Sequence, residues 1–330
     1  QGGCGACTVL VTYYDEKTGK HVNQPANGCL LPLLALDGCN VTTTEGIGNS
    51  RSGHHPVQQR LAANNGSQCG FCTPGMVMSM YSLLQETEGK PTLDQVSTAI
   101  DGNICRCTGY RPIVDAFNTF AVDCKNCPTV DIEDIGKGKK FMPYSHEEHD
   151  KKPPAELKTC KPSPIYFSGH GAEWHRVVEL QKALKLVQQY ETQGKKYKLI
   201  VGNTMNGVYP DPSVEAFIDI KHVPELKSIV ASDSALTVGA AVSIQQLIST
   251  FEEHKSKSPT TFPNIISHLS KISGRQVRGR ASWVGGVMMC KYQGFASDTA
   301  TVLYAAGARF SVLEASGTTT DMDMKALLSY

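Results

Sequence analysis

The sequence predicts a multidomain α+β protein, and three observations support this fold class. β-Branched and aromatic residues at 8–14 predict a strand close to the start. Residues 51–122 contain four helix-start signals. A stretch rich in proline and charge, 123–165, then leads into a mixed segment of helices and strands at 166–330. A chain of 330 residues can hold two or three domains, each with its own core.

Composition limits the possible partners. The chain is 40% apolar and 19% charged, with a formal net charge of +1, as in a soluble globular protein. A nearly neutral chain has no broad field to attract nucleic acid or a membrane surface. Apolar runs such as 29–36 are far too short to cross a bilayer. We therefore expect no nucleic-acid partner and no membrane partner.

Twelve cysteines require an explanation. A disulfide scaffold is one option, but disulfides usually support small secreted domains, and this chain is large enough to fold without them. The cysteines also cluster in close pairs, as metal ligands do. This pattern favours a metal-binding or cluster-binding protein with a cytoplasmic location.

The first cysteine set lies in residues 1–50, which we expect to form a small β-rich unit. Cys4 and Cys7 form a C-x2-C in a glycine-rich loop, and Cys29 follows at a distance. Glycine lets backbone N–H groups approach cluster sulfurs, because it has no Cβ to obstruct them. Plant-type ferredoxins add a ligand five residues before this pair, so we expect the natural chain to begin earlier than Gln1. The remaining expected elements are a short buried helix at 29–36 and a strand at 41–44.

The second cysteine set lies in residues 51–122. Cys69 and Cys72 form another C-x2-C, and Cys105 and Cys107 form a C-x-C. Each pair directly precedes a predicted helix, and the partial positive charge of a helix N-terminus suits an anionic cluster. The four helix-start signals are Pro56, Pro74, the capping box of Thr92 with Gln95, and Pro112.

Both sets are predicted to hold a [2Fe–2S] cluster, which makes electron transfer the predicted role of the chain. The rival hypothesis is a zinc-stabilised binding module without redox chemistry, because zinc also accepts four-cysteine sites. Met76, Met78 and Met80 are predicted to be core residues rather than ligands, and Cys39 a buried small apolar residue.

The segment 123–165 is predicted to be a linker. Cys124 and Cys127 form a further C-x2-C, and His146 and His149 follow, so a zinc site is conceivable here. The interpretation we favour is a solvated tether with incidental cysteines.

Residues 166–330 predict an α+β domain. A strand at 199–201 runs into the Gly/Asn/Thr loop 202–207, which offers backbone N–H groups to a pyrophosphate. This loop is neither G-x-G-x-x-G nor a P-loop, and a plain tight turn is an equal alternative. A second glycine-rich loop is expected at 282–286. The other expected elements are helices at 177–187 and 264–272, a helix capped by Ser243, strands at 216–220 and 236–240, and an apolar run from Asp298 to Ala306.

Several motifs together resemble those of the molybdenum-containing hydroxylases, which are the xanthine dehydrogenases and aldehyde oxidases. The segments that carry the resemblance are Gly2–Val9, Glu45–Gly48, His55–Gln58, Gln68–Gly75 and Gly102–Pro112. Residues 199–207 and 282–286 are similar to the two FAD loops of that family.

The resemblance implies three modules: a ferredoxin-like β-grasp domain at 1–50, a four-helix [2Fe–2S] domain at 51–122, and, after the linker, part of an FAD-binding domain at 166–330. That domain would be of the vanillyl-alcohol-oxidase/CO-dehydrogenase flavoprotein type. The implied enzyme is a homodimer that hydroxylates an aldehyde or a purine-like N-heterocycle at a molybdopterin domain beyond this chain. Electrons would pass through both clusters to FAD and on to O2 or NAD.

The resemblance also implies site residues. Metal ligands would be Cys4, Cys7, Cys29, Cys69, Cys72, Cys105 and Cys107. Cofactor contacts would come from Leu199, Ile200, Val201, Gly202, Asn203, Thr204, Met205, Asn206 and Gly207, from Ser282, Trp283, Val284, Gly285 and Gly286, from Ile272, from Asp298 near the flavin ribityl chain, and from Gln68 near the pterin. No catalytic residue is assigned within this chain.

Two positions depart from the family pattern: Gly286 replaces an Asn, and Ile272 stands where an aromatic residue is common. The chain resembles aldehyde oxidases more than xanthine dehydrogenases at Ser282–Trp283, at the Met288–Met289 pair and at Lys291. A stand-alone iron–sulfur/flavin subunit that docks on a separate molybdenum subunit is a further alternative.

Overall fold

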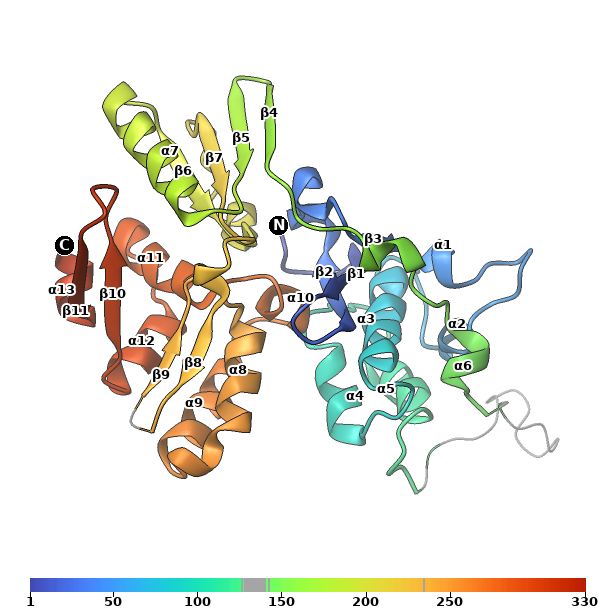
Figure 1. The fold of residues 1–330 in the computed structure, drawn as a ribbon. Helices are drawn as coiled ribbons and strands as arrows, with labels where there is room; N and C mark the ends of the chain where they lie inside the picture. The colour runs from blue at the N-terminus through green and yellow to red at the C-terminus, as the bar shows by residue number, and fades with distance from the viewer. Residues whose placement is uncertain (126, 128–140, 142, 234) are drawn as a thin grey trace. The chain divides into compact units, whose positions relative to one another are not determined.

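The computed structural model describes residues 1–125, 127, 141, 143–233 and 235–330 (Figure 1). The chain forms two compact units. The first holds Gln1–Lys161 and the short segment Gly274–Val277, and the second holds Pro162–Ser273 and Arg278–Tyr330. Within the described ranges, no helix combines the length and apolar character needed to cross a membrane. The three predicted domain ranges and the linker boundaries stay predictions.

A three-stranded antiparallel sheet begins the first unit, with β1 (Thr8–Asp15) between β2 (Lys20–Asn27) and β3 (Asn40–Thr42). β1 pairs with β2 from Thr8 opposite Asn27 to Asp15 opposite Lys20. The predicted strands at 8–14 and 41–44 are confirmed, the second one residue earlier and shorter. The predicted buried helix at 29–36 is wrong. Pro32 separates two 3-10 turns, Gly28–Leu30 and Leu33–Leu36, and Leu33 is 82% exposed.

The four predicted helices of this unit are confirmed, and a one-turn helix precedes them. Their bounds are α1 (Thr44–Ile47), α2 (Pro56–Ala63), α3 (Thr73–Glu86), α4 (Leu93–Ala99) and α5 (Arg111–Asn118). α3 is the central element, because it packs on β1 and β2 and also contacts α1, α2 and α4. It is therefore apolar on nearly every side, with Met76, Met78 and Met80 fully buried, as predicted for core residues. Cys39 is only half-buried, so its predicted burial is incomplete.

Part of the predicted tether, from Tyr144 to Asp150, packs against the first unit rather than standing free in solvent. α6 (His146–His149) places Asp150 in the core, where its carboxylate lies 2.8 Å from Nε2 of buried His55. Tyr144 also donates a hydrogen bond to Asp150. His146 and His149 bond to Asp150 and Ser145 respectively, and Cys124 and Cys127 form a disulfide. The predicted zinc site at Cys124 and Cys127 is wrong, because the disulfide uses both sulfurs. The prediction of incidental cysteines is wrong for the same reason.

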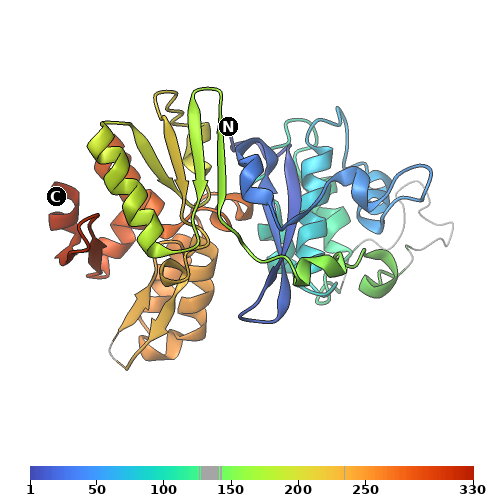
Figure 2. The same ribbon diagram turned by 45° about the horizontal axis from the view of Figure 1, so that its top comes forward.

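The second unit contains a four-stranded sheet in the order β4-β5-β7-β6, in which β5, β7 and β6 run parallel and β4 is antiparallel to β5. Helix α7 (Leu180–Gln193) crosses between β5 and β6 and covers one face of the sheet (Figure 2). The strand bounds are β4 (Ile165–Gly169), β5 (Ala172–Arg176), β6 (Tyr197–Ile200) and β7 (Ala216–Asp219). The predicted strand at 199–201 and helix at 177–187 are thus confirmed with shifted ends.

The remainder of the second unit is mostly helical. Ser243 caps α8 as predicted, with its side chain accepting from the Gln246 N–H. The other elements are β8 (Ile229–Ala231), β9 (Leu236–Val238), α8 (Ile244–Glu253), α9 (Thr261–Leu269), α11 (Trp283–Gln293), α12 (Asp298–Ala305), β10 (Arg309–Leu313), β11 (Thr319–Asp323) and α13 (Met324–Ser329), while α10 (Arg275–Arg278) lies mainly in the first unit.

Candidate functional site

The second cysteine set lies at the N-terminal ends of two helices. Cys72 is the N-cap residue of α3, and Cys69 lies in the loop just before it. Cys105 and Cys107 precede α5, whose N-cap Tyr110 has a left-handed φ of 67°. Pro74 and Pro112 start these helices as the sequence predicts. Each loop therefore leads into a helix N-terminus, a favourable setting for negative charge.

The structure brings all four thiols of the second set together across the two loops. The thiols of Cys69 and Cys107 lie near enough to shift one another's pKa, and so do those of Cys72 and Cys105. Among the residues that the structure describes, no three His, Cys, Asp or Glu side chains converge on a point suited to a single ion. A two-iron centre shares its four thiolates between two metals, so two neighbouring pairs of thiols fit it.

The buried pair of this set has contrasting acidities. Burial, with the adjacent Cys105 thiol, raises the pKa of Cys72 to about 11. Burial acts in the same direction at Cys105, but hydrogen bonds from Thr108 and nearby backbone N–H groups outweigh it and lower the pKa to about 7. Thr108 Oγ1 lies 3.1 Å from the Cys105 sulfur. The loop thus already stabilises a thiolate at Cys105, the form that binds iron.

The first cysteine set lies in loops around the three-stranded sheet. The Cys29 N–H donates to the Cys7 sulfur over 3.4 Å, and the neighbouring Cys29 thiol also affects the pKa of Cys7. Cys4 is held through its backbone, because its carbonyl oxygen accepts from the Ile104 N–H at 2.9 Å. Ile104 directly precedes Cys105. This backbone hydrogen bond therefore connects the loops of the two cysteine sets.

The two predicted FAD loops lie side by side within the second unit. A Cβ added to Gly202 would stand 2.1 Å from the Arg280 carbonyl oxygen, so the chain at 202 is pressed against the segment that leads into Ser282. Asn203 follows in a left-handed conformation with a φ of 54°, and Thr204–Gly207 form a 3-10 turn. Asn203 Oδ1 is buried without a hydrogen-bond partner, which leaves it available to a ligand. These features fit a nucleotide cofactor.

The prediction of a glycine-rich loop at 282–286 is wrong, because these residues begin a helix. Ser282 accepts from the Gly285 N–H and starts α11, so Trp283–Gly286 form the first helical turn. The Trp283 indole N–H donates to the Gly239 carbonyl at 2.9 Å, and its ring packs in the core. A Cβ on Gly286 would approach Ser297 Oγ to 2.9 Å, which explains why a small residue stands here.

The remaining predicted contacts have varied surroundings. Ile200 is buried in β6, whereas Leu199 on the opposite face is 47% exposed. Ile272 packs against the α8–α9 core. Asp298 at the start of α12 and Gln68 before Cys69 are both exposed. The structure does not test the flavin role of the first or the pterin role of the second.

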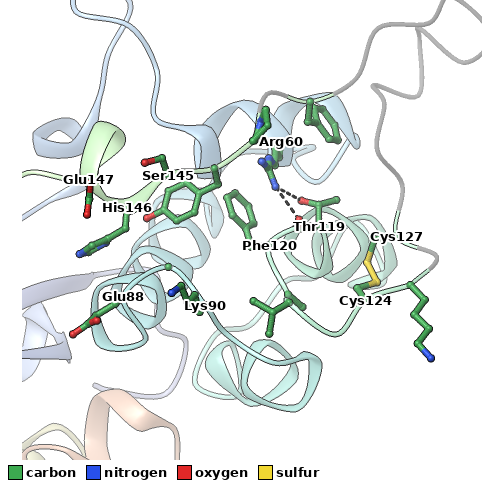
Figure 3. Close-up of a pocket in the computed structure, with 17 residues that line it drawn as sticks. Arg60, Glu88, Lys90, Thr119, Phe120, Cys124, Cys127, Ser145, His146 and Glu147 are labelled. Atoms are coloured by element: carbon green, nitrogen blue, oxygen red, sulfur yellow. Dashed lines mark hydrogen bonds between the residues drawn. A yellow bond between two sulfur atoms is a disulfide. The ribbon is translucent and has the colours of Figure 1, made fainter.

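A cavity of about 740 Å³ lies elsewhere in the first unit, and none of the seven predicted ligand cysteines lines it (Figure 3). Arg60 donates from Nη1 to the Thr119 carbonyl at 2.9 Å and stacks over the Phe120 ring at 4.0 Å. Burial lowers the pKa of Arg60 to about 10. The disulfide of Cys124 and Cys127 forms part of the wall. No sequence motif indicated this cavity.

Sequence reasoning also missed two buried amides near the cysteine sets, Asn103 and Gln276, which are 4% and 2% exposed. Gln276 Nε2 donates to Asn103 Oδ1 at 2.8 Å within the first unit. Asn103 belongs to the Gly102–Pro112 motif, but nothing in its local sequence shows which groups its side chain meets.

Comparisons with known proteins match two parts of the chain. Residues 43–118 match the family model of a [2Fe-2S] binding domain, and residues 168–329 match that of an FAD binding domain in molybdopterin dehydrogenase. The chain is 38% identical to an indole-3-acetaldehyde oxidase of Zea mays over 96% of its length, which is 25% of that relative. It is 36% identical to a xanthine dehydrogenase of Oryza sativa subsp. japonica over 95% of its length, which is 26% of that relative.

An aldehyde oxidoreductase structure from Desulfovibrio gigas shares 33% identity over 48% of this chain and 15% of that one, with a TM-score of 0.30, too low to support a structural argument. The chain thus spans about a quarter of the length of the curated relatives compared here. Over the matched residues it carries a [2Fe–2S] binding domain followed by an FAD binding domain, and it belongs to the molybdenum hydroxylase family.

Proposed function

We propose that this chain is the electron-transfer portion of a molybdo-flavoenzyme that hydroxylates aldehydes. The observation that carries the proposal is the presence of two separate thiol sets in one compact unit, connected by the hydrogen bond from the Ile104 N–H to the Cys4 carbonyl. One-electron carriers placed in sequence need this kind of short connection.

Seven cysteines would hold the iron. Cys69, Cys72, Cys105 and Cys107 would bind the cluster of the helical region, and Cys4, Cys7 and Cys29 would contribute to the cluster beside the sheet. Thr108 and the N–H groups at the starts of α3 and α5 would stabilise the negative charge of the helical-region cluster. Hydrogen bonding and burial tune the reduction potential of such a cluster. The sub-folds would be a ferredoxin-like β-grasp and a four-helix [2Fe–2S] domain.

The second unit would hold FAD in a domain of the vanillyl-alcohol-oxidase/CO-dehydrogenase flavoprotein type. FAD, when bound, exchanges electrons singly with the clusters and in pairs with the final acceptor. Asn203 Oδ1 and the backbone of 202–207 would bind its polar groups, with Ser282 and the first turn of α11 alongside. Asp298 would lie near the ribityl chain. Gly286 lies close to Ser297, and a Cβ there would stand 2.9 Å from Ser297 Oγ.

The substrate of the whole enzyme is proposed from its relatives. Three relatives at 36–38% identity are named for oxidation of indole-3-acetaldehyde or abscisic aldehyde, and a xanthine dehydrogenase is similar at 36%. We therefore favour an aldehyde over a purine-like substrate. The whole enzyme would be a cytoplasmic homodimer with a molybdopterin domain, near which Gln68 would lie, and O2 or NAD would be the acceptor.

A visible absorption spectrum with metal and flavin analysis of the purified chain tests the proposal. Oxidised iron–sulfur centres and flavin absorb visible light, whereas zinc does not. We expect iron and acid-labile sulfide in equal amounts, together with FAD. A colourless protein containing zinc would instead support the non-redox binding module.

A further inference from the structure

The loops of the two cysteine sets meet around one buried side chain, Asn103. Asn103 lies two residues before Cys105, is 4% exposed, and points toward the loop that holds Cys4 and Cys7. Its Nδ2 donates to the Gly5 carbonyl oxygen at 3.0 Å. The side chain of a residue next to one cysteine set thus binds the backbone within the other set.

The orientation of the Asn103 amide is determined by its partners. Oδ1 accepts from Ser79 Oγ at 2.7 Å and from Gln276 Nε2 at 2.8 Å. The carbonyl of Gly5 can only accept, so it must face the NH2 group. The bonds to Ser79, Gln276 and Gly5 can all form in only one orientation of the Asn103 amide. The side chain therefore has little freedom to rotate.

Close packing at three glycines allows this approach. Gly5 has a φ of 70°, and a Cβ there would stand 2.2 Å from the Gly102 carbonyl oxygen. A Cβ on Gly75, in the first turn of α3, would stand 2.2 Å from the Gly5 carbonyl oxygen. One on Gly102 would stand 2.1 Å from Gln276 Oε1. Main chains from three segments therefore meet without intervening side chains, and their spacing depends on the hydrogen bonds between them.

The Gly5 carbonyl also has local partners, which clarify what Asn103 adds. Thr8 donates to this oxygen from its backbone N–H at 3.1 Å and from its Oγ1 at 2.6 Å. These bonds shape the Cys4–Cys7 loop internally, because Thr8 follows Cys7 directly. The bond from Asn103, together with that from Ile104 to Cys4, connects this loop to the other cysteine set.

We propose that Asn103 is a positioning residue that holds the Cys4–Cys7 loop at a set distance and orientation from the cysteines of the helical region. The inference rests on the proposed function, in which both sets hold clusters. One electron would leave the reduced cluster of the helical region and enter the oxidised cluster beside the sheet, with no bond made or broken. Loss of the Asn103 bond would let the Cys4–Cys7 loop shift, and so change both the potential of its cluster and the magnetic coupling between the clusters.

The test substitutes Asn103→Asp in the full chain. An aspartate keeps both acceptor contacts, to Ser79 and Gln276, but has no NH2 to donate to Gly5. A second variant, Asn103→Leu, removes all three contacts without placing a charge there. The matched control is Ser79→Ala, which removes one hydrogen bond to Asn103 and leaves the bond to Gly5 in place.

The measurements are iron content, a redox titration followed by electron paramagnetic resonance, and the splitting caused by coupling of the two reduced clusters. Both Asn103 variants should change the splitting and shift the electron-sharing equilibrium between the clusters about tenfold, or ~59 mV for a one-electron couple. The signal of the helical-region cluster should keep its shape, and Ser79→Ala should resemble the parent protein. Selective loss of the sheet-side cluster in the Asn103 variants would also support positioning.

Parent-like splitting and potentials in both Asn103 variants, with both clusters present, would overturn the inference. Equal disturbance of both clusters by the Asn103 variants and by Ser79→Ala would overturn it too, because that result indicates a general structural role. Failure of the proposed function would look different, since the unsubstituted chain would then lack iron or contain a single type of cluster.

Discussion

The two cysteine sets differ in what supports them. In the helical-region set, Cys72 and Cys105 are 8% and 7% exposed and belong to the main apolar core of the first unit, whereas Cys69 and Cys107 are exposed. Cys4 and Cys29 are exposed, in loops around a small sheet. The helical-region set thus takes its geometry from a packed core, whereas the sheet-side set depends on glycine backbones and on hydrogen bonds received from the helical region. Loss of a hydrogen bond from the helical region to the sheet loops should therefore disturb the sheet-side set, whereas loss of a ligand cysteine should remove only its own cluster.

The largest expected effect comes from Cys105→Ser. A serine hydroxyl is a much weaker iron ligand than a thiolate, so the helical-region cluster should be lost and iron should fall by about half. The sheet-side signal should persist in electron paramagnetic resonance. Cys290→Ser, at a half-buried cysteine outside both sets, is the control and should leave the iron content unchanged. Unchanged iron in Cys105→Ser would refute the ligand assignment.

Phe117→Ala tests the packed core beneath the helical-region set. Phe117 is fully buried in α5, and its truncation should reduce the free energy of unfolding by about 3–5 kcal/mol. Phe71, 75% exposed between Cys69 and Cys72, is a matched control, and Phe71→Ala should change stability by about 0.5 kcal/mol or less. Chemical denaturation measures both. Equal effects would show that the core does not support this set as described.

Gly75→Ala separates the two sets from within α3. Alanine favours a helix over glycine by about 1 kcal/mol, but its methyl group would collide with the Gly5 carbonyl. We expect a net destabilisation of about 1–3 kcal/mol and weaker binding of the sheet-side cluster. Gly46→Ala in α1 is the control, because its nearest neighbour is a Thr42 methyl group at 3.2 Å. A stabilised Gly75→Ala protein with both clusters intact would contradict the close packing.

The smallest expected effect is that of Thr92→Ala. Thr92 accepts from the Gln95 N–H and caps α4, and loss of such a cap costs about 1 kcal/mol of stability. Both clusters should remain. Thr98→Ala, an exposed substitution within the same helix, should stay within about 0.5 kcal/mol of the parent in thermal unfolding. A cluster signal lost in Thr92→Ala would mean that α4 contributes more to the ligand loops than its cap suggests.

Local chemistry explains which elements were predicted well. The Thr92/Gln95 capping box, the Ser243 cap and the prolines that open α2, α3 and α5 act over three or four residues, so the sequence displays both partners. The errors have the same kind of cause. Pro32 divides the expected helix at 29–36, and the Ser282 cap makes a helical turn of an expected glycine loop. Gly286 in that turn allows α11 to pack closely against Ser297 and does not mark an irregular backbone.

The sequence by itself determined that two groups of cysteines exist, that one group precedes two helices, and that a cofactor-binding α+β segment follows. Spacing and capping signals act between near neighbours, which is why they can be read from the order of residues. Only the tertiary structure decided that Cys69 meets Cys107, that Cys72 meets Cys105, and that Asn103 reaches Gly5 across 98 positions of chain. Those contacts depend on how α3 packs against the sheet and the other helices, and packing is set by the whole core at once.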